Sequence, residues 1–196
     1  HHLLDEGWMY ELRFDDGVVS AGFVVEGTDK RRLLDSSPLE NFYRILRRYP
    51  SLAEQFENAT PTRPIQTMPT LQHRLARAVG TRWVALPNTY MFWSPLFSTG
   101  IAWSLLGVER LGLILEQAKT KNQLDEALVH YQDILECEAD HLRLLLKSAY
   151  RCRANFDTFV AFAQIYFAAA SYTETIQRIC KVPSEAKGNW AWWGFL

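Results

Sequence analysis

The chain has 196 residues, a formal net charge of −1, 48% hydrophobic residues and 13% aromatic residues, with seven Trp among them. This length allows one domain or two packed subdomains, and the balanced charge with few basic clusters excludes a nucleic-acid or membrane surface and favours small neutral ligands. Three widely spaced cysteines argue against a disulfide framework, so a cytoplasmic location is expected; no membrane span is expected, since no apolar run reaches about 18 residues.

The N-terminal segment predicts a β-hairpin. Residues 6–14 and 18–25 are rich in aromatic and β-branched side chains and are joined by Asp-Asp-Gly at 15–17, a strong hairpin signal. Large apolar residues alternate along the first strand and should share one face: Trp8, Tyr10, Leu12 and Phe14. The opposite face is expected to be more polar, with Met9, Glu11 and Arg13.

The middle of the chain predicts short elements separated by breaks. A helix is expected over 38–49, and a further turn capped by Ser51 over 51–58. The Thr-Pro-Thr-Arg-Pro sequence at 60–64 should end helical order. Two strands are expected over 71–79 and 83–86, followed by an apolar loop over 88–97.

The second half of the chain predicts helices almost to Val182. Apolar residues at helical spacing mark one face of the first helix: Ile101, Leu105, Val108, Leu111 and Leu115. The last helix, 156–181, is apolar nearly all round over 160–170, so we expect it to be deeply packed, and the aromatic tail over 189–195 should pack on a domain or partner. Strands followed by helices predict an α+β fold, with a β-rich part over 1–97 and a helical part over 98–196.

The segment 83–102 contains the most informative motif. It predicts a strand, an apolar loop and a Ser98-Thr99-Gly100 turn that opens a helix. The first N–H groups of a helix have no intrahelical partners and attract anions, and a glycine lets a flat ring approach the backbone. Ser and Thr are also ordinary helix caps, so on chemistry alone a structural role is favoured.

The longer string carries a family resemblance. Pro-Leu-Phe-Ser-Thr-Gly-Ile-Ala at 95–102, followed by Leu-Gly-Val-Glu-Arg-Leu at 106–111, resembles the second flavin-contact motif of flavin-dependent halogenases. Gly-Trp-Met-Tyr-Glu-Leu at 7–12 and Tyr-Phe-Ala-Ala-Ala-Ser-Tyr-Thr-Glu at 166–174 are similar to two further blocks of that family, in the same order. Tyr10, Leu12 and Arg13 depart from the family's second Trp, Ile and Pro.

The resemblance implies FAD as cofactor, chloride or bromide as co-substrate, an aromatic or electron-rich small-molecule substrate and a separate flavin reductase. It implies that backbone amides of Thr99 and Gly100 bind the halide. The implied cofactor-binding residues are Pro95, Leu96, Phe97, Ser98, Thr99, Gly100 and Ile101. The implied substrate-cavity residues are Trp8, Tyr10, Phe92 and Trp93.

Several features set limits on this resemblance. Phe97 stands where tryptophan-specific members carry a catalytic Glu, and Leu86-Pro87 stands where the wider class has Gly-Asp. The chain has no Gly-x-Gly-x-x-Gly, so the segment that binds most of the FAD, together with the relay lysine, is expected upstream, and the catalytic residue is unknown. This fragment alone is therefore expected to be inactive.

Two other classes of function remain open. One is a flavoprotein hydroxylase or reductase of the same fold without halide chemistry, and the other is a non-catalytic fragment that binds an apolar ligand or partner. Glu138 and His141 have the spacing of a carboxylate-bridged di-iron helix, but no second copy exists, so no metal site is expected and exposed polar positions explain them.

Overall fold

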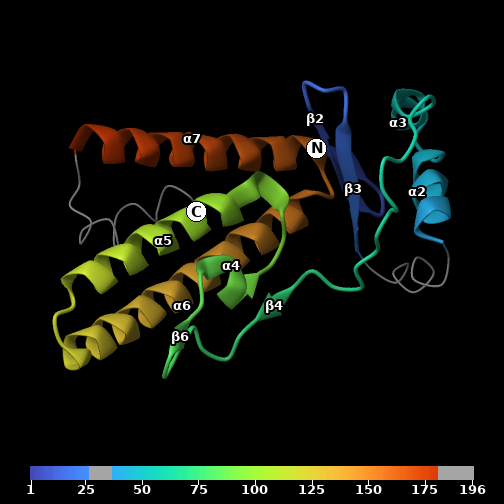
Figure 1. Ribbon diagram of the computed structural model, residues 1–196. Coiled ribbons are helices and arrows are strands. Elements are labelled where there is room, and N and C mark those ends of the chain that lie inside the picture. Colours follow the sequence, from blue (N-terminus) through green and yellow to red (C-terminus); the bar gives the residue numbers. More distant parts are fainter. Residues whose placement is uncertain (27–36, 181–196) are drawn as a thin grey trace. The chain divides into compact units, whose positions relative to one another are not determined.

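The computed structural model describes residues 1–26 and 37–180, which form helices and small antiparallel sheets (Figure 1). The chain divides into two compact units, His1–Thr70 and Leu71–Leu196. This division falls earlier than the boundary between 97 and 98, because the short strands after residue 71 pack with the helices. The α+β class and the helical C-terminal region are confirmed.

The first unit begins with a three-stranded antiparallel sheet in the order β1-β2-β3. The strands are β1 (His2–Leu4), β2 (Gly7–Arg13) and β3 (Val19–Val25). The predicted hairpin between β2 and β3 is confirmed: Gly17 has a φ of 81°, and the Asp16 Oδ1 accepts a hydrogen bond from the Val18 N–H at 3.0 Å. The left-handed region suits glycine, so this turn fixes the register that pairs Tyr10 with Gly22.

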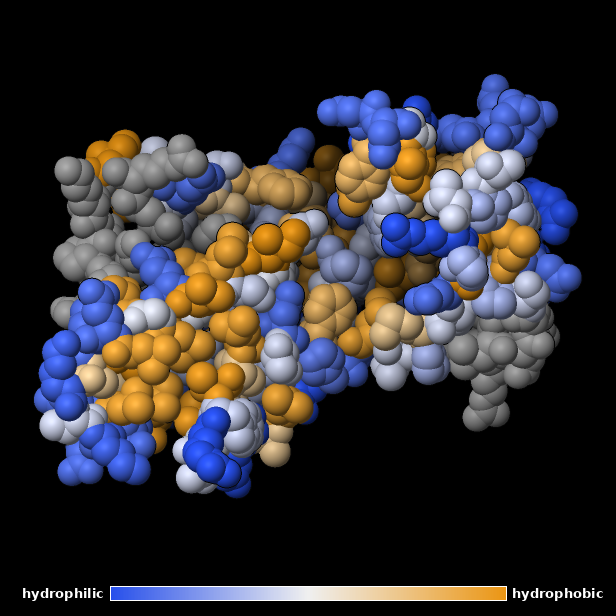
Figure 2. Space-filling model, viewed as in Figure 1, coloured by the Kyte–Doolittle hydropathy of each residue, from blue (hydrophilic) through white to orange (hydrophobic). Residues whose placement is uncertain are grey.

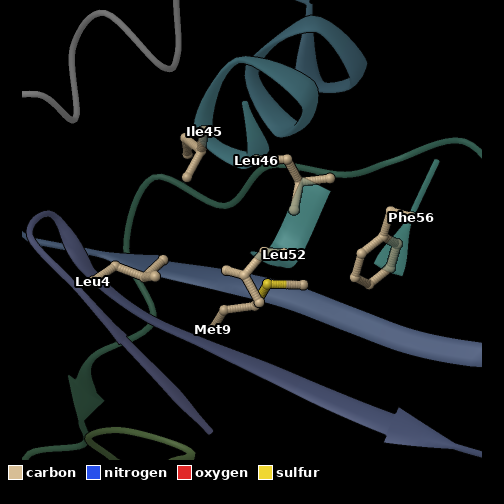
Figure 3. Packing of buried hydrophobic residues seen from close by; sticks show 6 residues of the cluster. All are labelled: Leu4, Met9, Ile45, Leu46, Leu52 and Phe56. Carbon is tan, nitrogen blue, oxygen red and sulfur yellow. The ribbon is translucent and has the colours of Figure 1, made fainter. Parts of the chain in front are cut away.

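The core of the first unit lies on the face of β2 that carries Met9 (Figure 3). Two short helices, α2 (Pro38–Leu46) and α3 (Pro50–Gln55), supply its other main residues. The buried cluster consists of Leu4, Met9, Ile45, Leu46, Leu52 and Phe56. The expectation that the Met9 face is the more polar one is therefore wrong. Met9 is fully buried, and of the three residues assigned to that face only Arg13 is exposed.

The second unit starts with two-residue strand pairs. β4 (His73–Arg74) pairs with β7 (Met91–Phe92), and β5 (Val79–Gly80) pairs with β6 (Trp83–Val84). These strands are much shorter than the sequence predicts. The predicted apolar loop instead contains the one-turn helix α4 (Pro87–Tyr90), which Pro87 opens, then β7 and the 3-10 turn η2 (Leu96–Ser98).

Three long helices complete the second unit: α5 (Thr99–Gln117), α6 (Lys121–Cys152) and α7 (Phe156–Cys180). Helix α6 contacts both α5 and α7. A capping box starts α6, in which the Thr120 side chain accepts from the Gln123 N–H and the Gln123 side chain accepts from the Thr120 N–H. The Asn155 side chain accepts from the Thr158 N–H and so caps the start of α7.

Helix α5 buries a different face from the one that the sequence predicts. The buried positions are Thr99, Trp103, Gly107 and Leu111. The other apolar strip is exposed and appears as apolar surface over α5 (Figure 2): Ile101, Leu105, Val108 and Leu115. Only Leu111 of the predicted face is buried, since the small residues on α5 decide which side α4 can approach.

Helix α7 is packed along one line only. Phe159, Tyr166 and Thr173 are buried at seven-residue intervals, whereas Ile165 is 72% exposed. The expectation of a deeply packed last helix is therefore wrong for the residues that the structure describes. The aromatic tail over 189–195 lies outside those residues.

One stretch meets the length and composition criteria for a membrane-crossing helix. It runs over Leu96–Gln117 and comprises η2 and α5, with 22% of its most apolar window buried. The expectation that no stretch qualifies is therefore too strict. The exposed apolar strip of α5 contributes to its hydropathy, while its inner face packs against α4 and α6.

Candidate functional site

Two consecutive residues at the Ser-Thr-Gly turn adopt the left-handed conformation. Phe97 has φ 64° and ψ 3°, and Ser98 has φ 56° and ψ 24°; among the described residues these are the only non-glycine positions with positive φ. Each such residue stores strain of roughly 1–3 kcal/mol, and strain of this kind concentrates at ligand sites. The surrounding contacts must therefore hold the turn in place.

Polar contacts fix the chain just before this turn. Ser94 is buried; its Oγ accepts a hydrogen bond from the Leu96 N–H at 3.2 Å and lies 2.8 Å from the Tyr150 hydroxyl on α6. The Ser98 N–H donates to the Pro95 carbonyl at 3.0 Å. These bonds tie the segment to α6 and bend it towards the start of α5.

The first turn of α5 has no side-chain cap. Helix α5 begins at Thr99, and the Ser98 side chain makes no capping hydrogen bond, so the first amides of α5 lack the acceptor that an N-cap side chain usually supplies. The Thr99 side chain is 5% exposed, and its Oγ1 has no hydrogen-bond partner. A buried hydroxyl without a partner is unfavourable by about 1–3 kcal/mol. Together with the helix dipole, these groups suit an anion.

Gly100 approaches a protein side chain rather than an open space. A Cβ at this position would lie 2.6 Å from the Asn88 Oδ1 and 2.7 Å from its Nδ2. Two helical turns later, a Cβ at Gly107 would lie 2.3 Å from the Pro87 Cδ. The two glycines therefore let α4 pack closely on α5. The sequence analysis expected Gly100 to let a flat ring approach the backbone. It did not identify the Asn88 amide, which lies beside Gly100 in the structure.

The Phe97 side chain lies in an aromatic cluster with residues of α7. Its ring stacks on Tyr166 with centroids 4.7 Å apart and an interplanar angle of 17°. The rings of Phe159 and Phe162 stack on it at 6.1 and 6.4 Å, and Phe167 meets it edge-on at 5.7 Å. Burial raises the pKa of the Tyr166 hydroxyl to about 12, so this ring stays neutral at physiological pH.

A buried polar centre supports α5 from behind. The Trp103 Nε1–H donates to the Glu138 Oε2 at 2.7 Å, and the Arg110 guanidinium forms an ion pair with the other carboxylate oxygen at 2.6 Å, without the alignment of a hydrogen bond. Glu138 is 1% exposed. Its interpretation as an exposed polar residue is therefore wrong. The sequence does indicate this burial, because Glu138 lies at helical spacing within the apolar strip between Leu135 and Leu142.

Next to this centre, the Tyr131 hydroxyl donates to the Ala85 carbonyl at 3.1 Å. Burial is the largest cause and raises the pKa of the Tyr131 hydroxyl well above its usual value. The charge of Arg110 lowers this pKa and the charge of Glu138 raises it, and neither reverses the effect of burial. Tyr131 is therefore a neutral donor that ties α6 to the strand before α4. Among residues 1–26 and 37–180, no three His, Cys, Asp or Glu side chains gather so that they could hold a metal ion.

The comparisons with known proteins agree on one group. No protein-family model matches the chain. It is similar to tetracycline 7-halogenase of Kitasatospora aureofaciens, with 24% identity over 152 residues, 69% of this chain and 27% of that protein. It is also similar to monodechloroaminopyrrolnitrin halogenase PrnC of Pseudomonas fluorescens, with 24% identity over 173 residues, 85% of this chain and 30% of that protein. The chain is a flavin-dependent halogenase-like protein.

A solved structure shares the fold of this halogenase-like chain. The crystal structure of halogenase PltM matches with a TM-score of 0.77 and 20% identity, over 99% of this chain and 42% of that one. The halogenase-like chain thus spans less than a third of the length of the two curated relatives.

The residues predicted to contact the cofactor lie in one segment but differ in access. Leu96 is buried and Phe97 is directed towards α7, so these two offer a ligand mainly their main chain. Ser98 and Ile101 are exposed, and Pro95 and Gly100 are half-buried. Thr99 is buried, with its unpartnered hydroxyl at the helix start.

The four predicted cavity residues fall in different units. In the first unit, Trp8 is buried with its ring 5.0 Å from that of His1, and the Tyr10 ring lies over Gly22, where a Cβ would meet it at 2.6 Å. In the second unit, the Phe92 ring stacks on His73 at 6.3 Å and Trp93 is half-buried. Their role in lining a substrate cavity stays a prediction.

Proposed function

We propose that this chain is part of a flavin-dependent halogenase and that its share of the active site is the first turn of α5. The main observation is the uncapped helix start with the buried, unpartnered Thr99 hydroxyl. Chloride or bromide would accept hydrogen bonds from the Thr99 and Gly100 amides. The similarity to two named halogenases supports this function over other anion-binding roles.

The residues present fit a bound FAD beside the turn. Ser98 and Ile101 are exposed and would face the cofactor, while Leu96 and Phe97 anchor the segment from within. When bound, reduced FAD together with dioxygen would supply the two-electron oxidising power that activates the halide. The chain's own residues would orient the halide, exclude water with the apolar side chains around the turn, and hold the flavin edge through residues 95–101.

The proposal extends to the surroundings of the reaction. The substrate would be an aromatic or electron-rich small molecule, and a separate flavin reductase would deliver reduced flavin. A cytoplasmic location is consistent with the free thiols of Cys137 and Cys152. These parts rest on the family resemblance and the composition.

A bromide titration of the 15N-labelled chain tests the proposal. In chloride-free buffer at constant ionic strength, the amide resonances of Thr99 and Gly100 should shift with bromide and saturate. The amides at the start of α6 provide an internal control, because the Thr120–Gln123 capping box already occupies them. Equal shifts at both helix starts, or none at α5, would refute halide binding at this turn.

A variant pair sharpens the titration. Thr99→Val removes the unpartnered hydroxyl with little change in shape and should weaken bromide binding, whereas Thr173→Val replaces another buried threonine, on α7, and should not. If the chain binds flavin but the Thr99 and Gly100 amide resonances do not shift with bromide, the result would instead support a hydroxylase or reductase without halide chemistry.

A further inference from the structure

The left-handed turn before α5 is held by a side chain rather than by a polar cap. The Ser98 side chain makes no cap hydrogen bond, and the Ser98 N–H reaches only back to Pro95 within the same turn. The Ser98–Pro95 bond closes the turn around Phe97 but does not hold the Phe97 side chain. Because ordinary residues rarely adopt the left-handed region, the ring contacts of Phe97 are a second set of interactions that keeps it there.

Those contacts come from α7, some sixty residues later in the chain. Tyr166 stacks on the Phe97 ring at a centroid separation of 4.7 Å, within the range that offset-stacked aromatic pairs prefer. Tyr166 and Phe159 are both buried and lie two turns apart on α7, so the Phe97 ring contacts the buried line of that helix. Neighbouring Phe162 and Phe167 complete the cluster.

We propose that Tyr166 is a positioning residue for the anion site at the start of α5. Its ring holds Phe97 in the left-handed conformation, and that conformation sets the direction of the Thr99 and Gly100 N–H groups. Tyr166 does not contact the anion itself. The identity of that anion as a halide rests on the proposed function, whereas the coupling of α7 to the turn does not.

Two NMR measurements on the full 15N-labelled chain separate these claims. Without bromide, the HN–Hα couplings and amide shifts of Phe97, Ser98 and Thr99 report the conformation of the turn. With bromide, the amide shifts of Thr99 and Gly100 report affinity. The variants are Tyr166→Ala, Tyr166→Leu and Tyr166→Phe, and Tyr172→Ala is the control because this tyrosine of α7 is exposed.

Tyr166→Ala and Tyr166→Leu should change the couplings at Phe97 and Ser98 and weaken bromide binding by about threefold to tenfold, as expected for the loss of one aromatic pair. Tyr166→Phe keeps the stacked ring and should restore both readouts, and Tyr172→Ala should leave them unchanged. The Leu variant keeps apolar volume, so it tests the ring even if the Ala variant does not fold.

Wild-type couplings and bromide affinity in folded Tyr166→Leu would overturn the proposal. Equal losses in Tyr166→Phe would also overturn it, because the hydroxyl and not the stacked ring would then matter. Absence of any bromide response in the wild type would count against the proposed function alone, since the couplings still measure the effect of Tyr166 on the turn.

Discussion

Glu138 allows the contribution of the buried polar centre to be measured. Its carboxylate is 1% exposed, accepts the Trp103 indole N–H at 2.7 Å and pairs with Arg110 at 2.6 Å. Glu138→Gln removes the charge and leaves the guanidinium, with 12% of its side chain exposed, without a counter-charge. Removing one partner of a buried ion pair destabilises a protein by about 3–5 kcal/mol, so unfolding should become easier by that amount.

Urea unfolding at pH 7, followed by helical circular dichroism, measures this change, because the long helices of the second unit supply most of the signal. Glu126→Gln, at an exposed position of the same helix, is the control and should change stability by less than about 0.5 kcal/mol.

A double variant makes the test stricter. Glu138→Leu with Arg110→Met removes both charges and should be less destabilised than Glu138→Gln alone, since no charge is left buried without a partner. A loss below about 1 kcal/mol in Glu138→Gln, smaller than the range for buried pairs, would refute the reasoning. Additive losses in the double variant would refute it too.

Two further predictions follow from contacts in the second unit. Gly107→Ala should destabilise that unit by about 1–3 kcal/mol in urea unfolding, because its Cβ would lie 2.3 Å from the rigid Pro87 ring, whereas Gly112→Ala, with nothing within 4 Å, should be neutral or slightly stabilising. The hydrogen bond from Arg74 holds the pKa of Asp140 below its usual value, despite the opposing effect of burial. The pair therefore stabilises the fold fully at pH values above the ordinary Asp pKa. This stabilisation is lost as the pH falls through the lowered pKa of Asp140. The stability difference between wild type and Asp140→Asn should therefore be present at pH 7 and shrink towards pH 3; a difference that grows on acidification would contradict it.

Local signals in the sequence predicted the elements well, and the packing between them less well. The Asp-Asp-Gly turn and the alternation along β2 placed the first hairpin correctly, because turn chemistry and strand period are local properties. The same alternation did not identify the core face: Met9 is the buried centre, while Leu12 and Phe14 at the far end of the Trp8 face are exposed. Which face of a hairpin is covered depends on α2 and α3.

The candidate site shows the same difference between local sequence signals, which could be predicted, and packing, which could not. The start of α5 at Thr99 could be predicted from Ser-Thr-Gly, and the family resemblance pointed to this segment. The left-handed pair at 97 and 98 could not, because neither Phe nor Ser favours that region and the contacts that stabilise it, among them those of Phe97 with α7, join residues far apart in the sequence. Periodicity likewise identified the apolar strip on α5, but not that Gly100 and Gly107 would turn the opposite side inward.

The exposed apolar strip of α5 also affects the solubility of the chain. Ile101 is 69% exposed, and Leu105, Val108 and Leu115 continue the same line along the helix. Contiguous apolar surface of this kind promotes self-association at the concentrations used for spectroscopy. Because none of these four side chains is buried in its own unit, their hydrophobicity is not required to hold the helices together. Polar replacements at Leu105, Val108 and Leu115 therefore offer a route to more soluble samples with the helix start unchanged.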